Sequence, residues 1–323
     1  MTDDERNLGD EFSQFDFEDK QIMARRLHMY SDKALEIGLQ IDQIFVNHTA
    51  FKQALASMDR IFQLSRKVDM PQGMRLIGPS GTGKTSLLRY FQQSLPKSSL
   101  FAEGLGAVYM RIPMRVTTLY MIASLLRQYG YPFRRITWDN YEQRITVLLD
   151  AIRQKGTQLI MIDEAHNLVP MTVRRKPTRE EGTSPTDFIR LLMDEAKVGV
   201  VLAGVGVLEH FADLDEALAS RVVGCLRLPV FDYDSAWVRL IKGLVQQSQC
   251  FDIGMLLKPD INRQLYKASQ GNLRSLKRLI TEMVLVAVED GVDCLGPAHL
   301  QKAYDLVYGA ASPQGNPFEA AVA

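Results

Sequence analysis

The stretch GPSGTGKT, residues 78–85, is the feature that most constrains what this chain can fold into. It matches G-x-x-x-x-G-K-[ST] at every fixed position, and it lies between an apolar segment, GMRLIG (73–78), and a helical pattern over 84–94. Glycines let backbone N–H groups turn inward around phosphate oxygens, and the start of the following helix adds partial positive charge. The stretch therefore predicts a strand, a phosphate-binding loop and a helix in direct succession.

The residues of this loop are predicted to bind a nucleotide, and two of them have specific roles. The Lys84 ammonium would bind phosphate oxygens, and the Thr85 hydroxyl would ligate Mg²⁺. The alternative is a glycine-rich turn with an unrelated lysine. The predicted nucleotide-binding residues are Gly78, Pro79, Ser80, Gly81, Thr82, Gly83, Lys84, Thr85 and Ser86.

The segment LIMIDE, residues 159–164, supplies the acids that a phosphate-binding loop requires. Asp163 would bind Mg²⁺ directly or through water, and Glu164 would orient and deprotonate the attacking water. The alternative is a pair of solvated acids in a turn. The predicted cofactors are therefore ATP and Mg²⁺, with Thr85 and Asp163 on the metal and Lys84 and Glu164 in catalysis. His166, two residues further on, either senses the terminal phosphate or is a hydrogen-bonded structural histidine.

Two arginines are further candidates. Arg221, in LASRVVG, lies where ring-forming ATPases present an arginine finger to the nucleotide of a neighbouring subunit. The alternative for Arg221 is a surface salt bridge. Arg274, in GNLRSLKRLI, begins a helix from which it would reach the nucleotide, and the alternative there is a solvated basic face.

Hydrophobic periodicity predicts how the chain is organised. Apolar strands at 73–78, 106–113, 157–166 and 198–205 alternate with helices, which indicates a parallel sheet covered on both faces. Helical patterns alone follow Pro229. We expect an acidic tail and helical extension over 1–45, an α/β nucleotide-binding domain over 46–230, a small all-helical lid over 231–310 and a loose tail over 311–323.

Composition excludes several classes of protein. Lys plus Arg and Asp plus Glu are equal at 38 each in 323 residues, so a globally basic DNA-coating protein is not indicated. Three cysteines lie far apart and match no zinc spacing, which favours a reducing compartment. No run of about 18 apolar residues is present, so we expect no membrane partner and a cytoplasmic location.

These motifs, in this order and spacing, resemble those of AAA+ ATPases. With FVNHTAFKQALASMDRIFQLSR before the loop, the chain resembles the TnsC/TniB branch over roughly residues 44–310. The resemblance implies ATP-dependent rings or filaments on double-stranded DNA that link a targeting complex, TniQ-like or CRISPR-associated, to transposase subunits. The end of the fourth strand, LAGVG (202–206), departs from the family pattern, because it has no polar residue to sense the terminal phosphate.

DNA contact in such a protein would be non-specific and directed to the phosphate backbone. Three basic segments are candidates, and each is alternatively a solvated loop. The candidate residues are Arg115, Thr117, Thr118, Arg134, Arg135, Arg174, Arg175 and Lys176.

Two other functions remain open at this stage. A helicase-loader or initiator ATPase would share the same core, and a nucleotide-gated scaffold would bind ATP with little turnover. The letters DEAH also occur in RNA helicases, but those need two tandem RecA-like domains, and this chain has room for one.

Reversing the charge at Arg174 and Arg175 tests the third basic segment. If both side chains bind phosphates, the slope of log affinity against log salt concentration should fall by about 1 for each phosphate that is no longer neutralised. Fluorescence anisotropy with a labelled duplex at several salt concentrations measures this slope. An unchanged slope removes the segment from the candidates.

Overall fold

The computed structural model describes residues 20–21, 29–95, 104–133, 136–168, 183–213, 215–309 and 315–319. The chain divides into two compact units. The α/β unit comprises Asn47–Asp232 together with Asn272–Arg274, and the helical unit comprises the described parts of Met1–Val46, Tyr233–Gly271 and Ser275–Ala323. Helix α2 (Asp32–Gln43) thus groups with the C-terminal helices, although it precedes the α/β unit in the sequence.

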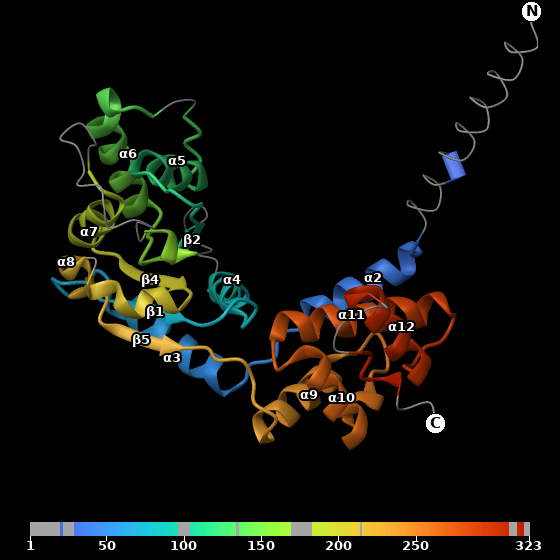
Figure 1. Cartoon of the computed structure of the whole chain (residues 1–323). Helices are drawn as coiled ribbons and strands as arrows, with labels where there is room; N and C mark the ends of the chain where they lie inside the picture. Colours follow the sequence, from blue (N-terminus) through green and yellow to red (C-terminus); the bar gives the residue numbers. More distant parts are fainter. Residues whose placement is uncertain are drawn as a thin grey trace, which may run out of the picture. The chain divides into compact units, whose positions relative to one another are not determined.

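A five-stranded, all-parallel sheet forms the centre of the α/β unit (Figure 1). Its order is β2-β3-β4-β1-β5, so the first strand of the chain lies between the fourth and the fifth. The strands are β1 (Gly73–Ile77), β2 (Ala107–Arg111), β3 (Leu159–Asp163), β4 (Gly199–Gly204) and β5 (Gly224–Arg227). The predicted α/β fold is confirmed, and all five carboxyl ends meet at one edge of the sheet.

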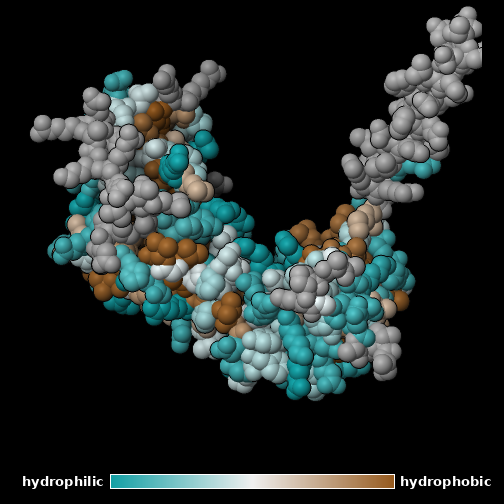
Figure 2. Space-filling view, viewed as in Figure 1, coloured by the Kyte–Doolittle hydropathy of each residue, from teal (hydrophilic) through white to brown (hydrophobic). Residues whose placement is uncertain are grey.

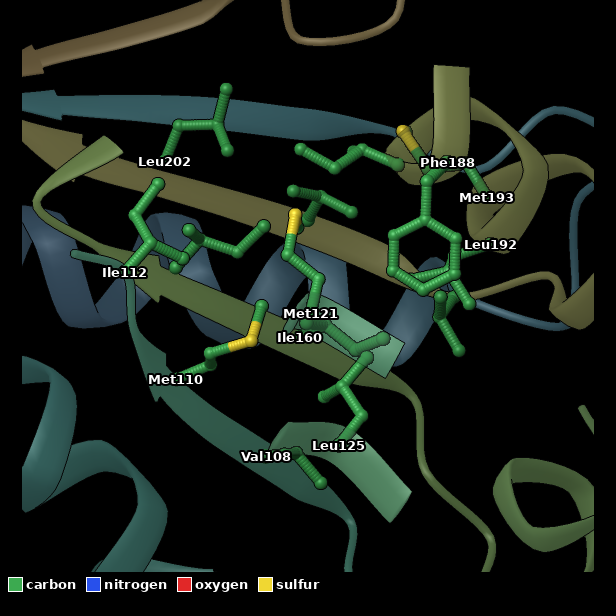
Figure 3. Close-up of a cluster of buried hydrophobic side chains, with 14 of the residues drawn as sticks. Val108, Met110, Ile112, Met121, Leu125, Ile160, Phe188, Leu192, Met193 and Leu202 are labelled. Atoms are coloured by element: carbon green, nitrogen blue, oxygen red, sulfur yellow. The ribbon is translucent and has the colours of Figure 1, made fainter. Parts of the chain in front are cut away.

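Helices cover both faces of this sheet, and alternation along the strands assigns each side chain to a face. On one face, Met110 and Ile160 pack with Met121 of α5 and Phe188 of α7 (Figure 3). On the other face Gly199 approaches α3, where an added Cβ would lie 2.4 Å from Ile61 Cγ2. The helices of the unit are α3 (Thr49–Leu64), α4 (Lys84–Ser94), α5 (Thr118–Gln128), α6 (Tyr141–Gln154), α7 (Pro185–Ala196) and the short α8 (Glu216–Ala219).

Helix α7 was not among the helices expected from the sequence. Its start is nevertheless encoded locally: the Ser184 side chain accepts from Asp187 N, the Asp187 side chain accepts from Ser184 N, and Pro185 is the first helical residue. Phe188, Ile189 and Leu192 are buried in the core that this helix completes. The sequence around residues 184–187 therefore contains a local signal for the start of this helix.

Helix α2 packs with the C-terminal helices of the helical unit, as Figure 1 shows for α2 beside α11. The approach is close, because a Cβ added to Gly38 would lie 2.7 Å from Leu285 Cδ2. Ser31 caps α2, accepting from Ala34 N. The other helices of this unit are α9 (Ser235–Gln247), α10 (Pro259–Ser269), α11 (Leu273–Glu289) and α12 (Pro297–Tyr308). Only the first two residues of α11 belong to the α/β unit.

On the face shown in Figure 2, many of the described residues are hydrophilic (teal), with smaller hydrophobic areas in brown. Exposed apolar side chains include Met114, Trp138 and Val223 in the α/β unit and Leu35 and Leu39 on α2. Within the described part of the chain, no helix has the length and apolar character needed to cross a bilayer.

Lys277 of α11 ends α2 by donating to Ile41 O and Ile44 O, each at 2.9 Å. Burial lowers the pKa of Lys277 to about 8, and Asp42 opposes this shift. An unfolded lysine titrates near ~10.4, so between these values the unfolded chain binds more protons than the folded one. Burying the ammonium therefore destabilises the fold most at pH values below the pKa of Lys277 in the folded protein. This destabilisation is lost as the pH rises toward the pKa of lysine in the unfolded chain.

We expect the free energy of unfolding of the wild type, relative to Lys277→Met, to rise between pH 7.5 and pH 10 by up to about 3 kcal/mol. Urea unfolding followed by circular dichroism measures it. Lys242→Met, at an exposed lysine of α9, is the matched control. A difference between wild type and Lys277→Met that does not change with pH would contradict the assignment.

Candidate nucleotide-binding site

The loop 78–83 joins the carboxyl end of β1 to the start of α4, at the edge where the parallel strands end. Gly81 and Gly83 have φ of +82° and +90°, a left-handed conformation that side-chain-bearing residues rarely adopt. Gly83 also packs closely, since a Cβ there would lie 2.6 Å from Phe51 Cζ. Thr82 is buried and donates to Pro79 O at 3.0 Å, while Ser86 is exposed. The loop conformation thus depends on its glycines.

Lys84 is the first residue of α4, and its side chain reaches back to the loop. Its Nζ donates to Gly78 O at 2.7 Å and to Pro79 O at 2.8 Å. Burial lowers the pKa of Lys84, while Asp163 and Glu164 act to raise it and Arg274 to lower it further. No salt bridge to Lys84 occurs among the described residues. The Lys84 ammonium is thus half-buried at the start of a helix and forms no salt bridge with a described residue. Such a positive charge can bind the phosphates of a nucleotide.

Asp163 is buried, and its carboxylate is held from three sides. Thr85 Oγ1 donates to Oδ2 at 2.6 Å, Tyr109 Oη donates to Oδ2 at 3.0 Å, and Glu164 N donates to Oδ1 at 2.9 Å. Burial, followed by the neighbouring Asp163, raises the pKa of Tyr109 to about 12, so its hydroxyl remains a donor.

These oxygens also suit a hard cation. Mg²⁺ prefers oxygen ligands and commonly takes only one or two from the protein, with substrate phosphates and water completing the set. Thr85 and Asp163 are the two residues that would hold it. Among the described residues no group of three or more His, Cys, Asp or Glu side chains forms a separate metal site. The donor set therefore fits a metal bound together with a nucleotide.

Glu164 follows Asp163 in an unusual conformation. Its φ is +57°, and a non-glycine residue in that region costs on the order of 1 kcal/mol and is often found at functional sites. Its Oε1 accepts from Arg111 Nη2 at 3.1 Å, and its Oε2 lies 3.5 Å from His166 Nδ1. Because of this conformation, the Glu164 carboxylate contacts Arg111 and His166, whereas the Asp163 carboxylate contacts Thr85 and Tyr109.

Arg274, which belongs to the α/β unit, contacts the phosphate-binding loop. Its Nη1 donates to Ser80 Oγ at 3.0 Å, and its backbone N donates to Gly81 O at 3.0 Å. Asn272, which sequence reasoning missed, donates through Nδ2 to Ser80 O at 2.8 Å. The guanidinium is thus adjacent to the predicted phosphate site, while its role toward a nucleotide stays a prediction.

Arg221 has partners within its own subunit. Its Nε and Nη2 donate to the two carboxylate oxygens of Asp194 at 3.1 and 2.9 Å, and its Nη1 donates to Ala217 O at 2.9 Å. Among the described residues it makes no hydrogen bond to the loop. The salt bridge considered as the alternative is therefore present, and a finger that acts across a subunit boundary would first have to release Asp194.

The DNA candidates fall into three groups. Arg115 is exposed with φ of +54°, and Thr117 caps α5 by accepting from Tyr120 N. The expectation for Thr118 is corrected: its side chain is buried and its hydroxyl donates to Thr183 O, so it is not available to DNA. The remaining candidates, Arg134, Arg135, Arg174, Arg175 and Lys176, lie outside the described residues.

Tyr109→Phe tests whether the Tyr109 hydroxyl orients Asp163. Removing an outer partner of a metal ligand commonly costs about 10-fold or more in metal affinity. We expect the Mg²⁺ concentration that half-saturates nucleotide binding to rise by about that factor, with little change in nucleotide affinity at saturating Mg²⁺. Titrating MgCl₂ against a fluorescent ATP analogue measures this, and Tyr90→Phe on α4 is the control. Identical Mg²⁺ curves would remove Tyr109 from the site.

Solved structures with the same fold include the Aeropyrum pernix ORC1 protein in complex with DNA (TM-score 0.55, 16% identity, 80% of this chain and 65% of that one). The Aeropyrum pernix ORC2 protein in ADPNP–ADP complexes matches with TM-score 0.59 and 16% identity, over 84% of this chain and 72% of that one. Cdc6p from Pyrobaculum aerophilum matches with TM-score 0.54 and 17% identity, over 78% and 65%. The chain thus spans about two thirds of the length of these proteins, and the likeness establishes the AAA+ fold.

A family model is more specific. The model described as bacterial TniB protein matches residues 38–231, which is more than half of the chain. A search of curated proteins found no match. The matched residues include the loop 78–85, Asp163, Glu164 and Arg221. The chain belongs to the TniB family and is a TniB-type AAA+ ATPase by fold.

Proposed function

We propose that this protein binds ATP with Mg²⁺, hydrolyses it, and uses the bound nucleotide to control its assembly on double-stranded DNA as a regulator of transposition. The observation that carries the proposal is the Thr85–Asp163 hydrogen bond of 2.6 Å, which joins the phosphate-binding loop to the acidic end of β3 in a TniB-family chain.

The residues divide the chemistry between them. Lys84 and the backbone N–H groups of the loop bind phosphate oxygens, and Thr85 and Asp163 hold the metal. Mg²⁺ held by Thr85 and Asp163 would neutralise charge on the phosphates. Glu164 accepts the proton of the attacking water at a carboxylate oxygen, because it is the acid beside Asp163 that the metal site does not use.

The ion pair between Glu164 and Arg111 links this base to a candidate DNA-binding segment. While the Arg111 guanidinium occupies Oε1 of Glu164, that oxygen is engaged in the ion pair and is not free to hold a water molecule. Arg111 is the last residue of β2, and Arg115 and Thr117 follow within six residues. A duplex bound by that segment would disturb Arg111 and release Glu164, which would make hydrolysis depend on DNA.

DNA binding and assembly are supported by the family and by the fold. Two structural neighbours, the Aeropyrum pernix ORC1 protein and Drosophila ORC (TM-score 0.51, 16% identity), were solved bound to DNA. In a TniB-family protein the partners would be further copies of this chain, transposase subunits and a TniQ-like or CRISPR-associated targeting complex.

Initiator-type or helicase-loading activity is the second candidate, because the structural neighbours are origin-recognition and Cdc6 proteins. A nucleotide-gated scaffold with little turnover is a third, because β4 ends without a polar side chain at Gly204. A loader would require a helicase and prefer single strands or forks, and a scaffold would assemble on duplex without measurable turnover.

Glu164→Gln tests the proposal directly. The variant should bind ATP with normal affinity, hydrolyse it at least about 100-fold more slowly, and persist on duplex DNA as oligomers. ATPase assays with and without duplex, combined with negative-stain imaging, measure both properties. Glu195→Gln, at an exposed acid of α7, is the matched control, and Lys84→Ala should lose nucleotide binding. Normal turnover by Glu164→Gln would show that Glu164 is not the base.

A further inference from the structure

The end of β4 lies beside the phosphate-binding loop but offers no polar side chain to it. Gly204, the last residue of β4, pairs with Ile77 of β1, and its carbonyl accepts from Gly78 N at 3.1 Å. Leu202 and Ala203 before it are buried and apolar. A hydrogen-bond donor at this position must therefore come from another element.

The place that a side chain of Gly204 would take is bordered closely by His166 and Leu208. A Cβ built on Gly204 would lie 3.2 Å from His166 Nδ1 and 3.1 Å from His166 N. It would also lie 2.8 Å from Leu208 Cδ1, which is the end of a flexible side chain. A side chain at position 204 and the imidazole of His166 thus compete for one space, and the absence of a side chain at Gly204 accommodates the ring.

His166 has hydrogen-bonding capacity that the fold does not use. It lies on η2 (Ala165–Leu168), two residues after Glu164, and its Nδ1 is buried without a hydrogen-bond partner among the described residues. Glu164 Oε2, at 3.5 Å, is close to Nδ1 but outside good hydrogen-bond geometry. A structural histidine would normally have its buried ring nitrogen satisfied.

The position beside Glu164 is also the chemically relevant one. Water attacks the terminal phosphate of a nucleoside triphosphate, so the base and any group that detects this phosphate must lie on the same side of it. The His166 side chain is 27% exposed and next to Glu164, which leaves part of the ring open to a ligand.

We propose that His166 is the phosphate-sensing residue of this protein: its imidazole takes the place of the side chain that β4 lacks and donates a hydrogen bond to the terminal phosphate of a bound nucleoside triphosphate. This rests on the proposed function. With this hydrogen bond, the protein would distinguish ATP from ADP although β4 ends without a polar side chain.

Nucleotide preference, measured without turnover, tests the proposal. Isothermal titration with ADP and with a non-hydrolysable ATP analogue, both with Mg²⁺, gives the ratio of their dissociation constants. His166→Ala should reduce the preference for the triphosphate by about tenfold and leave the ADP affinity within about twofold, as expected for loss of one hydrogen bond to a charged group. His210→Ala, at an exposed histidine of the same unit, is the control. A preference that His166→Ala leaves unchanged overturns the proposal.

A double-mutant cycle tests the shared space and guards against a general effect on folding. Gly204→Asn alone should clash with the imidazole and lower the melting temperature. Combined with His166→Ala, the asparagine gains the space of the imidazole and supplies a donor, while the contacts with the backbone N of residue 166 and with Leu208 remain, so both melting temperature and triphosphate preference should recover in part. Additive effects of the two substitutions would overturn the shared-space argument.

The outcomes also separate this inference from the proposed function. If the wild-type chain binds neither nucleotide, the proposed function fails and the inference fails with it. If the wild type prefers the triphosphate and His166→Ala prefers it equally, the proposed function stands and the inference alone is wrong.

Discussion

One buried carboxylate organises the nucleotide-binding edge of this protein. Asp163 accepts from Thr85 at the start of α4, from Tyr109 on β2 and from the backbone of Glu164. A buried carboxylate is costly unless it is hydrogen-bonded, so these donors offset the cost of burying Asp163 and hold α4, β2 and the end of β3 together. The same arrangement leaves Thr85 and Asp163 as adjacent oxygen ligands. The positions of the loop, the metal ligands and the base depend on this set of hydrogen bonds.

The predicted site residues are held in place by partners of the same subunit. Beside that carboxylate, Lys84 donates to carbonyls of the phosphate-binding loop and Glu164 is paired with Arg111; near the amino ends of the strands, Arg221 is paired with Asp194. Exposed ion pairs contribute little to stability, typically about 0–1 kcal/mol, so the pairs of Glu164 and Arg221 are readily exchanged for a ligand or a neighbouring subunit. These side chains are therefore held in definite positions, but a ligand or a neighbouring subunit can take the place of their present partners.

Sequence reasoning succeeded where a local pattern carries the information. The loop 78–85 and the strands around it follow from short-range spacing, and the structure contains them. It failed where distant segments meet. Thr118 was taken for a DNA-binding residue but is buried against Thr183, and Tyr109 and Asn272 were missed because they act on residues 54 and 192 positions away.

The sequence by itself determined the fold class, the family and the acids at the end of β3, because those depend on motifs of a few residues and on hydrophobic periodicity. Only the tertiary structure decided that Arg111 holds Glu164, that Arg221 pairs with Asp194, and that His166 fills the space beside Gly204. The contacts of Glu164 and His166 arise where parallel strands bring their carboxyl ends to one edge, whereas Arg221 meets Asp194 near the amino ends of the strands. No local pattern specifies which side chains then meet, because the pairs come from separate strands, turns and helices.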